Sequence, residues 1–405
     1  MNVLIVHNTY QQPGGEDVVV AQESSLLERY GHNVHVYTRS NNELNALSLG
    51  QKLGLIGRII SAPDTKIAVR DVIQAFKPDV VHVHNTFAMV SPSVYEVCQD
   101  ENIPVVQTLH NYRLLCPAST FYRDEAICEE CATESLLRSM RYGCYHDSHA
   151  MSGVMALMLQ THRLRRTWSE GINAYIAISD FVKDRFEKSG FPSGKIHVKP
   201  NFVEPDPGER TCFGEYALFV GRLSAEKGLR TLLEAWQLLP TTIPLVIVGD
   251  GPMRLELEAE VAAKGIKGVR FTGQLSRDDV HGAIKKAAFV VVPSIWYEPF
   301  GLIVAEAFAC GTPVVGACVG GIKEMLEDGI TGLRVFPGDP DSLADKVRWA
   351  WDHAPELAVM GKAGRRVYEH RYTAEINYDQ LMRIYASTID AHITRTQSTS
   401  SRAAA

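Results

Sequence analysis

The sequence lacks several features that mark specialised classes of protein. No apolar run in its 405 residues reaches the ~20 residues that a membrane-spanning helix needs. Basic residues do not outnumber acidic ones, and the net charge of −6 argues against a general nucleic-acid-binding protein. The apolar run at 3–6 is too short for a signal-peptide core and has no basic flank. We therefore expect a cytoplasmic protein that binds no nucleic acid.

What is present describes a globular protein of ordinary composition. Hydrophobic residues make up 45% of the chain and charged residues 22%. Its length is large for one domain and suits two. Both halves repeat short apolar strands followed by amphipathic helices, which predicts parallel sheets with right-handed crossovers. We predict an α/β fold of two Rossmann-like, doubly wound parallel-sheet domains that face a cleft.

A Pro-rich run near the middle of the chain marks the predicted domain boundary. We expect an N-terminal domain over 1–205, with a Cys-containing insertion at 112–150, and a C-terminal domain over 206–372. A long amphipathic helix is predicted over 373–394. The small, polar residues 395–405 predict a disordered tail.

The stretch from Ser294 to Gly311 carries the most informative pattern. The apolar run before it predicts a buried strand, and LIVAEAFA after Gly301 predicts a buried helix. Glu298 and Glu306 stand about 12 Å apart along a helix axis. The helix N-terminus between them offers free N–H groups to a phosphate. The stretch could hold the sugar, diphosphate and ribose of a nucleotide-sugar, or it could be a turn into a core helix with two incidental acids.

Two features of the N-terminal half suggest ligand contacts less specifically. Gly14 and Gly15 precede a predicted helix, where glycine allows a phosphate to approach the backbone, although a simple turn explains them as well. His110 follows a predicted strand, and ligands of doubly wound sheets bind outside the carboxyl ends of strands. A histidine at a strand end also commonly has a purely structural role.

Four of the eight cysteines lie in the insertion, in a loop that we expect to be irregular. They are Cys116, Cys128, Cys131 and Cys144. In a reducing compartment, clustered cysteines indicate a metal rather than disulfides. Four thiolates in one loop predict a structural zinc site, with buried thiols or a redox pair as the alternatives.

Two further patterns have a functional and a structural interpretation. Residues 151–168 are first apolar and Met-rich and then basic, which indicates either a helix on a membrane surface or a core helix with a basic end. Asp339 and Asp341 could be a metal-binding acid pair. They precede a predicted helix, so we interpret them as helix caps.

Taken together, these motifs resemble the retaining nucleotide-sugar glycosyltransferases of family 4, which have the two-domain GT-B architecture. The resemblance is strongest from about 216 to 336, through FVGRLSAEKGL, IVGDGP, VRFTGQL, PSIWYEPFGLIVAEAFACGTPVV and GGIKEMLEDGITG. The N-terminal half matches more loosely, through the glycine loop, His110 and the KPNFV linker. The cysteine insertion is not part of the family's core pattern.

The resemblance implies a role for each matching residue. Arg222 and Lys227 would bind the donor diphosphate, Glu298 the hydroxyls of the donor sugar, and Glu306 the ribose. His110 would lie at the donor sugar near the reacting carbon, and Gly14 and Gly15 near the phosphates. The backbone of Phe300, Gly301 and Leu302 would line the sugar and the phosphates. Gln274 and Leu275 would lie near the base. The C-terminal helix would cross back to the N-terminal domain, which would contact the acceptor.

The resemblance predicts an enzyme that transfers a sugar, with retention, from a UDP- or GDP-sugar to a saccharide or lipid-linked acceptor in polysaccharide or glycoconjugate biosynthesis. His110, Arg222, Lys227 and Glu298 are the predicted catalytic residues. Two cations and a helix N-terminus can stabilise the leaving diphosphate, so we expect no catalytic metal. Residues 151–168 suggest a peripheral contact at the inner face of the membrane. The alternatives are a sugar-nucleotide epimerase on the same fold and a non-catalytic nucleotide-sugar binding protein.

Overall fold

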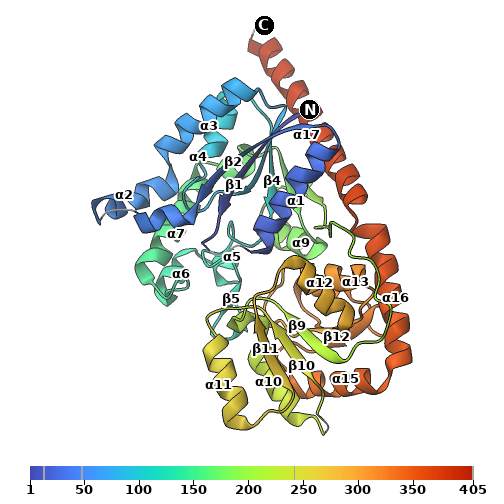
Figure 1. Ribbon diagram of the computed structural model, residues 1–405. Coiled ribbons are helices and arrows are strands. Elements are labelled where there is room, and N and C mark those ends of the chain that lie inside the picture. The colour runs from blue at the N-terminus through green and yellow to red at the C-terminus, as the bar shows by residue number, and fades with distance from the viewer. Residues whose placement is uncertain (12–13, 47–48, 241, 404–405) are drawn as a thin grey trace. The chain divides into compact units, whose positions relative to one another are not determined.

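The computed structural model describes residues 1–11, 14–46, 49–240 and 242–403. The chain divides into two compact units (Figure 1). Unit 1 comprises Met1–Thr120, Glu129–Lys199 and Asn377–Ala405, and unit 2 comprises Phe121–Cys128 and Pro200–Ile376. The passage from unit 1 to unit 2 at Lys199–Pro200 lies close to the boundary expected at 205.

Unit 1 is built on a parallel sheet with six strands in its described part. In spatial order these are β2 (Asn33–Ser40), β1 (Asn2–Thr9), β3 (Val80–Asn85), β4 (Val105–Leu109), β7 (Ala174–Ala177) and β8 (Ile196–Val198). Each neighbouring pair is parallel. The central strands β3, β4 and β7 are completely buried, as expected for a sheet covered on both faces, and β3 and β4 also bury polar side chains.

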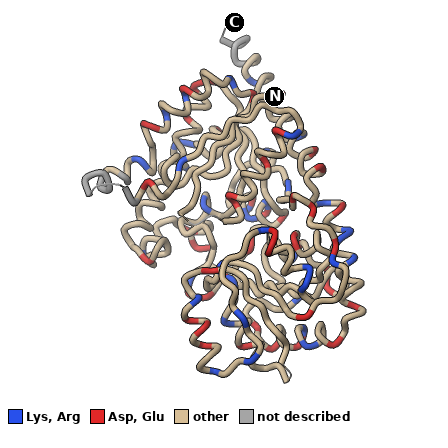
Figure 2. The backbone as a smooth tube through the Cα atoms, in the orientation of Figure 1, with Lys and Arg blue, Asp and Glu red and all other residues tan. Residues whose placement is uncertain are grey.

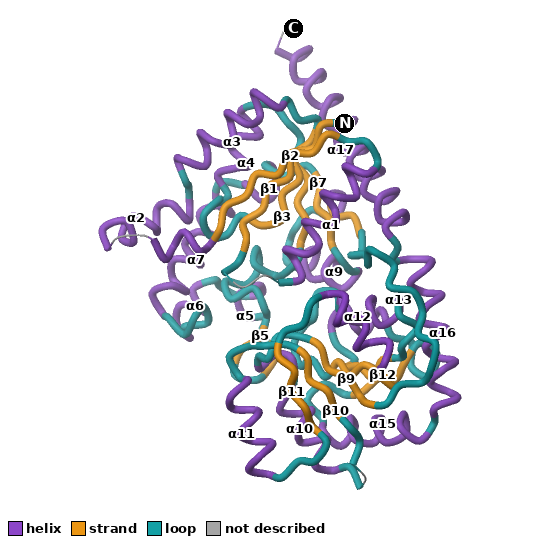
Figure 3. The backbone as a smooth tube through the Cα atoms, in the orientation of Figure 1, coloured by secondary structure: helices purple, strands orange, loops and turns teal. Residues whose placement is uncertain are grey.

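Helices cover this sheet and the loops at its strand ends (Figure 3). They are α1 (Gly15–Arg29), α2 (Leu49–Ile60), α3 (Pro63–Phe76), α4 (Ser93–Asp100), α5 (Glu130–Thr133), α6 (Leu137–Tyr142), α7 (His149–Leu164), α8 (Thr167–Glu170), α9 (Asp180–Lys188) and, from Asn377 onward, α17 (Ala374–Ala403). Short 3-10 turns occupy Asn41–Ala46 and Ser193–Lys195.

Unit 2 contains a second parallel sheet, again with six strands in its described part. In spatial order these are β11 (Val269–Gly273), β10 (Leu245–Val248), β9 (Tyr216–Val220), β12 (Ala287–Val292), β13 (Val314–Ala317) and β14 (Gly332–Val335). Numbered within the unit, this order is 3-2-1-4-5-6, the order of the dinucleotide-binding Rossmann fold. The strand order therefore reverses between β9 and β12.

The helices of unit 2 follow its strands in regular alternation. They are α10 (Leu229–Leu238), α11 (Arg254–Lys264), α12 (Arg277–Lys286), α13 (Leu302–Ala309), α14 (Gly320–Met325), α15 (Pro340–Asp352) and α16 (Ala354–Arg371), with a 3-10 turn at Ala225–Lys227. The apolar side chains of α10, α15 and α16 pack on β9, β10 and β12 to form one buried core. Each strand thus ends in a loop that leads into a helix.

Side chains cap helices in both units. The Ser179 hydroxyl accepts a hydrogen bond from the Val182 N–H at 3.1 Å and begins α9. The Asp339 carboxylate accepts one from the Ser342 N–H at 2.9 Å and begins α15. Asp339 is therefore a cap, as interpreted from the sequence.

The insertion is more regular than we expected. The strands β5 (Tyr122–Arg123) and β6 (Ala126–Ile127) form an antiparallel hairpin, and the helices α5 and α6 follow it. The two turn residues, Asp124 and Glu125, both have positive φ angles, of 52° and 57°. Such turns usually contain glycine, so the Asp–Glu sequence did not indicate a hairpin.

The C-terminal helix extends beyond its predicted end. We expected it over 373–394, followed by a disordered tail, but α17 continues to Ala403. The final two residues of that tail lie outside the described residues. From Asn377 onward the helix belongs to unit 1, where Leu381, Ile384 and Tyr385 pack against the core formed by β1, β3 and β7.

This packing predicts how strongly α17 stabilises unit 1. Leu381 is completely buried, so Leu381→Ala should lower the free energy of unfolding by about 2–5 kcal/mol. Ile393 is 48% exposed on the same helix, and Ile393→Ala should change it by less than about 0.5 kcal/mol. Urea denaturation followed by circular dichroism measures both. Equal stability of the two variants would show that α17 does not pack as described.

Candidate functional site

The predicted donor residues gather where the strand order of unit 2 reverses. β9 has β10 on one side and β12 on the other, so the loops that leave β9 and β12 turn in different directions. Open parallel sheets bind ligands at such a point. The loop after β9 carries Arg222 and Lys227, and the loop after β12 carries Glu298.

Lys227 and Glu298 form an ion pair between these two loops. Lys227 Nζ donates to Glu298 Oε2 at 2.7 Å, and the same oxygen accepts from Trp296 Nε1 at 3.0 Å and Ser294 Oγ at 3.3 Å. The ammonium also lies 5.2 Å from the centre of the Trp296 ring. Lys227 is 22% exposed and Glu298 15%, so a ligand can reach the pair. From sequence we had assigned the two residues to different parts of the donor and had not predicted the contact.

Glycine residues hold the Glu298 loop in place. The Gly321 N–H donates to the Glu298 carbonyl at 2.7 Å. A Cβ atom on Gly321 would lie 2.8 Å from the carbonyl oxygens of Pro299 and Phe300, too close for any other residue. The beginning of α14 therefore packs directly on the backbone that follows Glu298. From the sequence we had not assigned this role to Gly321.

Glu306 lies in the second turn of α13, whose first turn begins after Gly301. The side chain is 12% exposed. Its Oε1 atom is 3.9 Å from Arg277 Nε and 3.7 Å from His281 Nε2, both too far for a hydrogen bond. Within the described part of the chain, the buried Nε and Nη2 of Arg277 and Nε2 of His281 form no hydrogen bond either.

This arrangement leaves the Glu306 carboxylate ready to accept hydrogen bonds from hydroxyl groups. Arg277 and His281 lie on α12, which begins just after the predicted base contacts Gln274 and Leu275. Gln274 is exposed and Leu275 is half-buried. Sequence reasoning missed Arg277 and His281, because a basic residue in the first turn of a helix has no distinctive spacing relative to an acid 29 positions further on.

Arg222 is exposed at the end of β9. Among the described residues, no acidic side chain pairs with its guanidinium. The structure thus brings Lys227 and Glu298 together and leaves Arg222 available to a ligand. Its contact with the diphosphate stays a prediction.

In unit 1, two carboxylates lie in the first turn of α1, next to the glycines where we expected phosphate contacts. Gly14 caps α1, and its N–H already donates to Asp17 Oδ2 at 2.8 Å. Asp17 Oδ1 lies 2.8 Å from His7 Nε2. Tyr10 OH donates to Glu16 Oε2 at 3.3 Å. Burial and the charge of Asp17 raise the pKa of Glu16 to about 8, so Glu16 is mostly protonated at neutral pH. The phosphate role of Gly14 and Gly15 stays a prediction.

His110 lies just beyond β4, next to β3. Its Nε2 is 2.9 Å from His84 Nδ1. Both residues line a small pocket of about 40 Å³ at the carboxyl ends of the two strands, together with Asn85, Gln107 and Arg113. Burial lowers the pKa of His110 to about 3, so its imidazole is neutral. A larger cavity of about 680 Å³, lined by Leu333, Trp349 and Met360 among others, contains none of the predicted site residues.

The structure places the four predicted zinc ligands in both units. Cys128 belongs to unit 2, and Cys116, Cys131 and Cys144 belong to unit 1. Among the described residues, the group of candidate ligands close enough to hold an ion is instead Glu23, His82 and His84. The zinc site in the insertion stays a prediction.

The distribution of charged and apolar residues bears on the nucleic-acid and membrane contacts considered from the sequence. Figure 2 shows basic and acidic residues interspersed over both units. In the part of the chain that the structure describes, no helix has the length and apolar character needed to cross a membrane. α7 buries Met155, Met158 and Leu159, so residues 151–168 contribute to the core, although Leu157 and Leu164 are exposed.

Comparison with known families matches both units. Residues 13–207 match the family described as Glycosyltransferase Family 4. Residues 214–367 match the family described as Glycosyl transferases group 1. The two matches follow one another along the chain and cover most of both sheets. The chain belongs to glycosyltransferase family 4.

Several known sugar transferases are similar in sequence. A D-rhamnosyltransferase of Pseudomonas aeruginosa is 35% identical over 190 residues, which are 46% of this chain and 48% of that protein. An alpha-D-kanosaminyltransferase of Streptomyces kanamyceticus is 27% identical over 294 residues, 70% of each chain. The chain spans only 48% and 40% of the length of the first two curated relatives it matches.

Solved structures of glycosyltransferases share the fold. Sucrose-phosphate synthase from Thermosynechococcus elongatus has a TM-score of 0.74 at 20% identity, covering 96% of this chain and 99% of that one. HepE of Anabaena, solved in complex with UDP and glucose, has a TM-score of 0.69 at 19% identity, covering 96% and 100%. The two α/β domains of the GT-B architecture are therefore confirmed.

The protonated Glu16 predicts a pH dependence in this family 4 protein. Its folded-state pKa of about 8 exceeds the ordinary value of 4.5, so the folded protein retains a proton that the unfolded chain releases. Stability should therefore fall as the pH rises from 4.5 to about 8, by about 1.4 kcal/mol per pH unit at most. Glu16→Gln removes this loss.

Urea denaturation checks this at about pH 5 and about pH 9. Glu16→Gln should match the wild type at the lower pH and be more stable at the higher pH. Glu28 is exposed on the same helix, so Glu28→Gln is the matched control and should change neither value. A Glu16→Gln variant with the wild-type pH dependence would contradict the protonated state.

Proposed function

We propose that this protein is a retaining glycosyltransferase that moves a sugar from a nucleotide-diphosphate sugar to a saccharide or lipid-linked acceptor. The observation that carries the proposal is the Lys227–Glu298 pair at the reversal point of the unit 2 sheet. Glu306 follows on α13, beyond a first helical turn whose N–H groups suit a phosphate. Family membership and the UDP and glucose bound to HepE support the same reading.

Each residue of this ion pair can exchange its partner for a group of the ligand. A bound diphosphate would take the Lys227 ammonium, and the Glu298 carboxylate would then accept hydrogen bonds from hydroxyls of the donor sugar. The distance from Gly301 to Glu306 is about 7.5 Å along the helix axis. This span allows the carboxylate of Glu306 to bind ribose hydroxyls while the first turn of α13 binds the diphosphate.

Transfer requires stabilisation of the leaving group. The bond between the anomeric carbon and the phosphate oxygen breaks, and negative charge develops on the nucleoside diphosphate. Lys227, Arg222 and the helix N-terminus are preorganised to stabilise this charge, which is usually the largest catalytic contribution. We propose that they do so without a divalent metal ion.

The acceptor and a contact with the membrane are the remaining parts of the proposal. Exposed apolar side chains on the adjoining helices α6 and α7 lie near basic residues of the same helices. They are Leu137, Met140, Leu157 and Leu164. Apolar side chains flanked by arginines favour a peripheral contact with an anionic membrane, which would suit a lipid-linked acceptor.

Glu306→Ala should weaken nucleotide binding. Each charge-assisted hydrogen bond is worth about 1.5–3 kcal/mol, so the dissociation constant of UDP or GDP should rise at least tenfold. Isothermal titration calorimetry with both nucleotides measures this. Glu327 is an exposed acid of the same unit, and Glu327→Ala should bind like the wild type. An unchanged dissociation constant in Glu306→Ala would remove Glu306 from the nucleotide site.

Lys227→Ala should lower turnover by about 10²-fold or more, the scale seen when one preorganised charge stabiliser is removed. The assay follows transfer of labelled sugar and release of nucleoside diphosphate from UDP-, GDP- and ADP-sugars, with EDTA and with magnesium. Lys264→Ala, which removes a surface lysine paired with Glu260, is the control.

The same assay tests metal independence, which activity abolished by EDTA and restored by magnesium would refute. Conversion of the sugar without transfer would indicate an epimerase, and tight binding without release a binding protein.

A further inference from the structure

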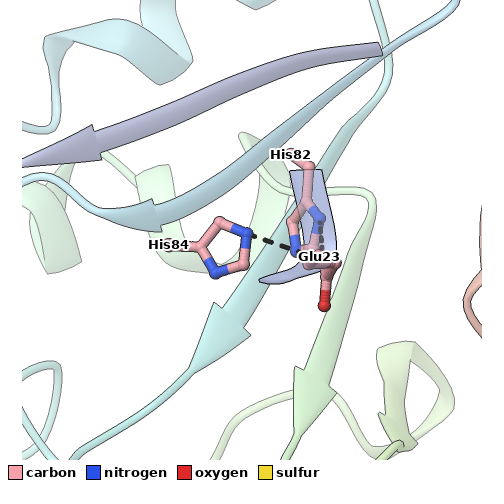
Figure 4. A group of neighbouring side chains, drawn as sticks. All are labelled: Glu23, His82 and His84. Atoms are coloured by element: carbon pink, nitrogen blue, oxygen red, sulfur yellow. Dashed lines mark ion pairs between the residues drawn. The ribbon is translucent and has the colours of Figure 1, made fainter. Parts of the chain in front are cut away.

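A buried polar cluster in unit 1 connects α1 with the strand ends that carry His84 and His110. Glu23 lies on α1, and His82 and His84 lie on β3, with 1%, 0% and 3% of their surfaces exposed. Glu23 Oε1 is 2.9 Å from His82 Nδ1 and 3.6 Å from His84 Nε2 (Figure 4). His84 Nδ1 in turn lies 2.9 Å from His110 Nε2.

Glu23 is ionised in this cluster. Lys199 Nζ, itself 2% exposed, donates to Glu23 Oε2 at 2.9 Å and to Asn377 Oδ1 at 3.1 Å. Burial alone would raise the pKa of Glu23, but the charge of Lys199 and the contact with His82 hold it well below its ordinary value. An ionised carboxylate can only accept hydrogen bonds.

The Glu23 carboxylate determines which ring nitrogen carries the proton in His84 and, through His84, in His110. His84 Nε2 faces Glu23 Oε1 at 3.6 Å, and the negative charge at this distance favours a proton on that nitrogen. A neutral imidazole with its proton on Nε2 has a lone pair on Nδ1. His84 Nδ1 must then accept from His110 Nε2, which leaves the lone pair of His110 on Nδ1. Burial lowers the pKa of His84 well below its usual value, and that of His110 to about 3, so both rings remain neutral.

We propose that Glu23 and His84 are positioning residues that hold His110 in its Nε2–H tautomer, so that His110 Nδ1 accepts a hydrogen bond from a hydroxyl group of a bound sugar. Among the described residues, no side chain other than His84 forms a hydrogen bond with the His110 ring. The identity of the ligand rests on the proposed function, but the tautomer follows from unit 1 alone. The other tautomer would present an N–H group and would require the same hydroxyl to accept.

The same three side chains could instead hold a metal ion, because their ligand atoms lie within 4.8 Å of one another. Three contacts favour the hydrogen-bonded arrangement. The Lys199 ammonium already neutralises Glu23. His82 is held on both sides, by Tyr385 OH at 2.7 Å from Nδ1 and by Thr108 Oγ1 at 2.7 Å from Nε2. A cation at this position would be repelled by Lys199 and would displace the hydrogen bond to Tyr385.

Long-range ¹H–¹⁵N NMR spectra of the full chain, labelled with ¹⁵N-histidine, report the tautomer of each ring. His110→Asn identifies the His110 signals. We expect a neutral Nε2–H ring from about pH 5 to about pH 9, because burial keeps the ring from titrating. His84→Leu should give a mixture of tautomers, and His84→Asn should restore the wild-type state because the amide oxygen can replace Nδ1 as acceptor. His82→Leu is the matched control, since His82 contacts Glu23 but not His110.

A double variant covers the case in which His84→Leu does not fold. Glu23→Leu combined with Lys199→Met replaces the buried ion pair by apolar side chains of similar size, which proteins often tolerate. It should also give mixed tautomers at His110. An Nδ1–H ring in the wild type, an unchanged His110 spectrum in both variants, or a metal ion bound at His84 Nε2 would overturn the proposal.

A turnover assay of the His84 variants tests the positioning role separately from the proposed function. With the donor that the nucleotide-sugar assay identifies, His84→Leu should lower kcat at least tenfold relative to His82→Leu, with a smaller change in the KM of the donor, and His84→Asn should recover it. Normal turnover in a variant with mixed tautomers would overturn the positioning role. A chain that uses no donor would refute the proposed function, while the spectra would still decide the tautomer.

Discussion

The ion pair between Lys227 and Glu298 is the contact on which the candidate site of unit 2 depends. It exists because β9 and β12 are neighbours in the sheet, although 66 residues lie between the end of β9 and the start of β12. The loops that follow these two strands carry the two charges. Gly321 packs on the backbone after Glu298, and Trp296 and Ser294 donate to its carboxylate. The loop is therefore held rigidly while the ammonium remains accessible. A site of this kind can bind phosphate with little rearrangement.

The two units each contain a lysine–glutamate pair, but burial gives the pairs different consequences. Glu23 and Lys199 are 1% and 2% exposed, and breaking such a pair costs about 3–5 kcal/mol because it leaves a charge without a partner. Lys227 and Glu298 are partly open to solvent, where an ion pair is worth about 1 kcal/mol or less. The buried pair can therefore fix the protons of neighbouring histidines, whereas the open pair can exchange its partners for a ligand.

The sequence was sufficient for the fold and for part of the site. Short apolar runs rich in β-branched residues, such as AAFVVV, are typical of buried parallel strands, and the cap at Asp339 depends on local chemistry. The contacts of Lys227 with Glu298, of Glu23 with His84, and of Glu306 with Arg277 join residues distant in sequence. They depend on strand order and side-chain direction, which periodicity does not specify. The hairpin at Asp124 and Glu125 was missed because its turn contains no glycine.

The central claim is that a nucleoside diphosphate binds where the strand order of unit 2 reverses. A crystal structure of the full chain with UDP or GDP tests it most directly. We predict that the diphosphate lies against the first turn of α13, that Lys227 Nζ moves from Glu298 to a phosphate oxygen, and that both ribose hydroxyls donate to Glu306. A nucleotide bound elsewhere, with the Lys227–Glu298 pair unchanged, would contradict the account.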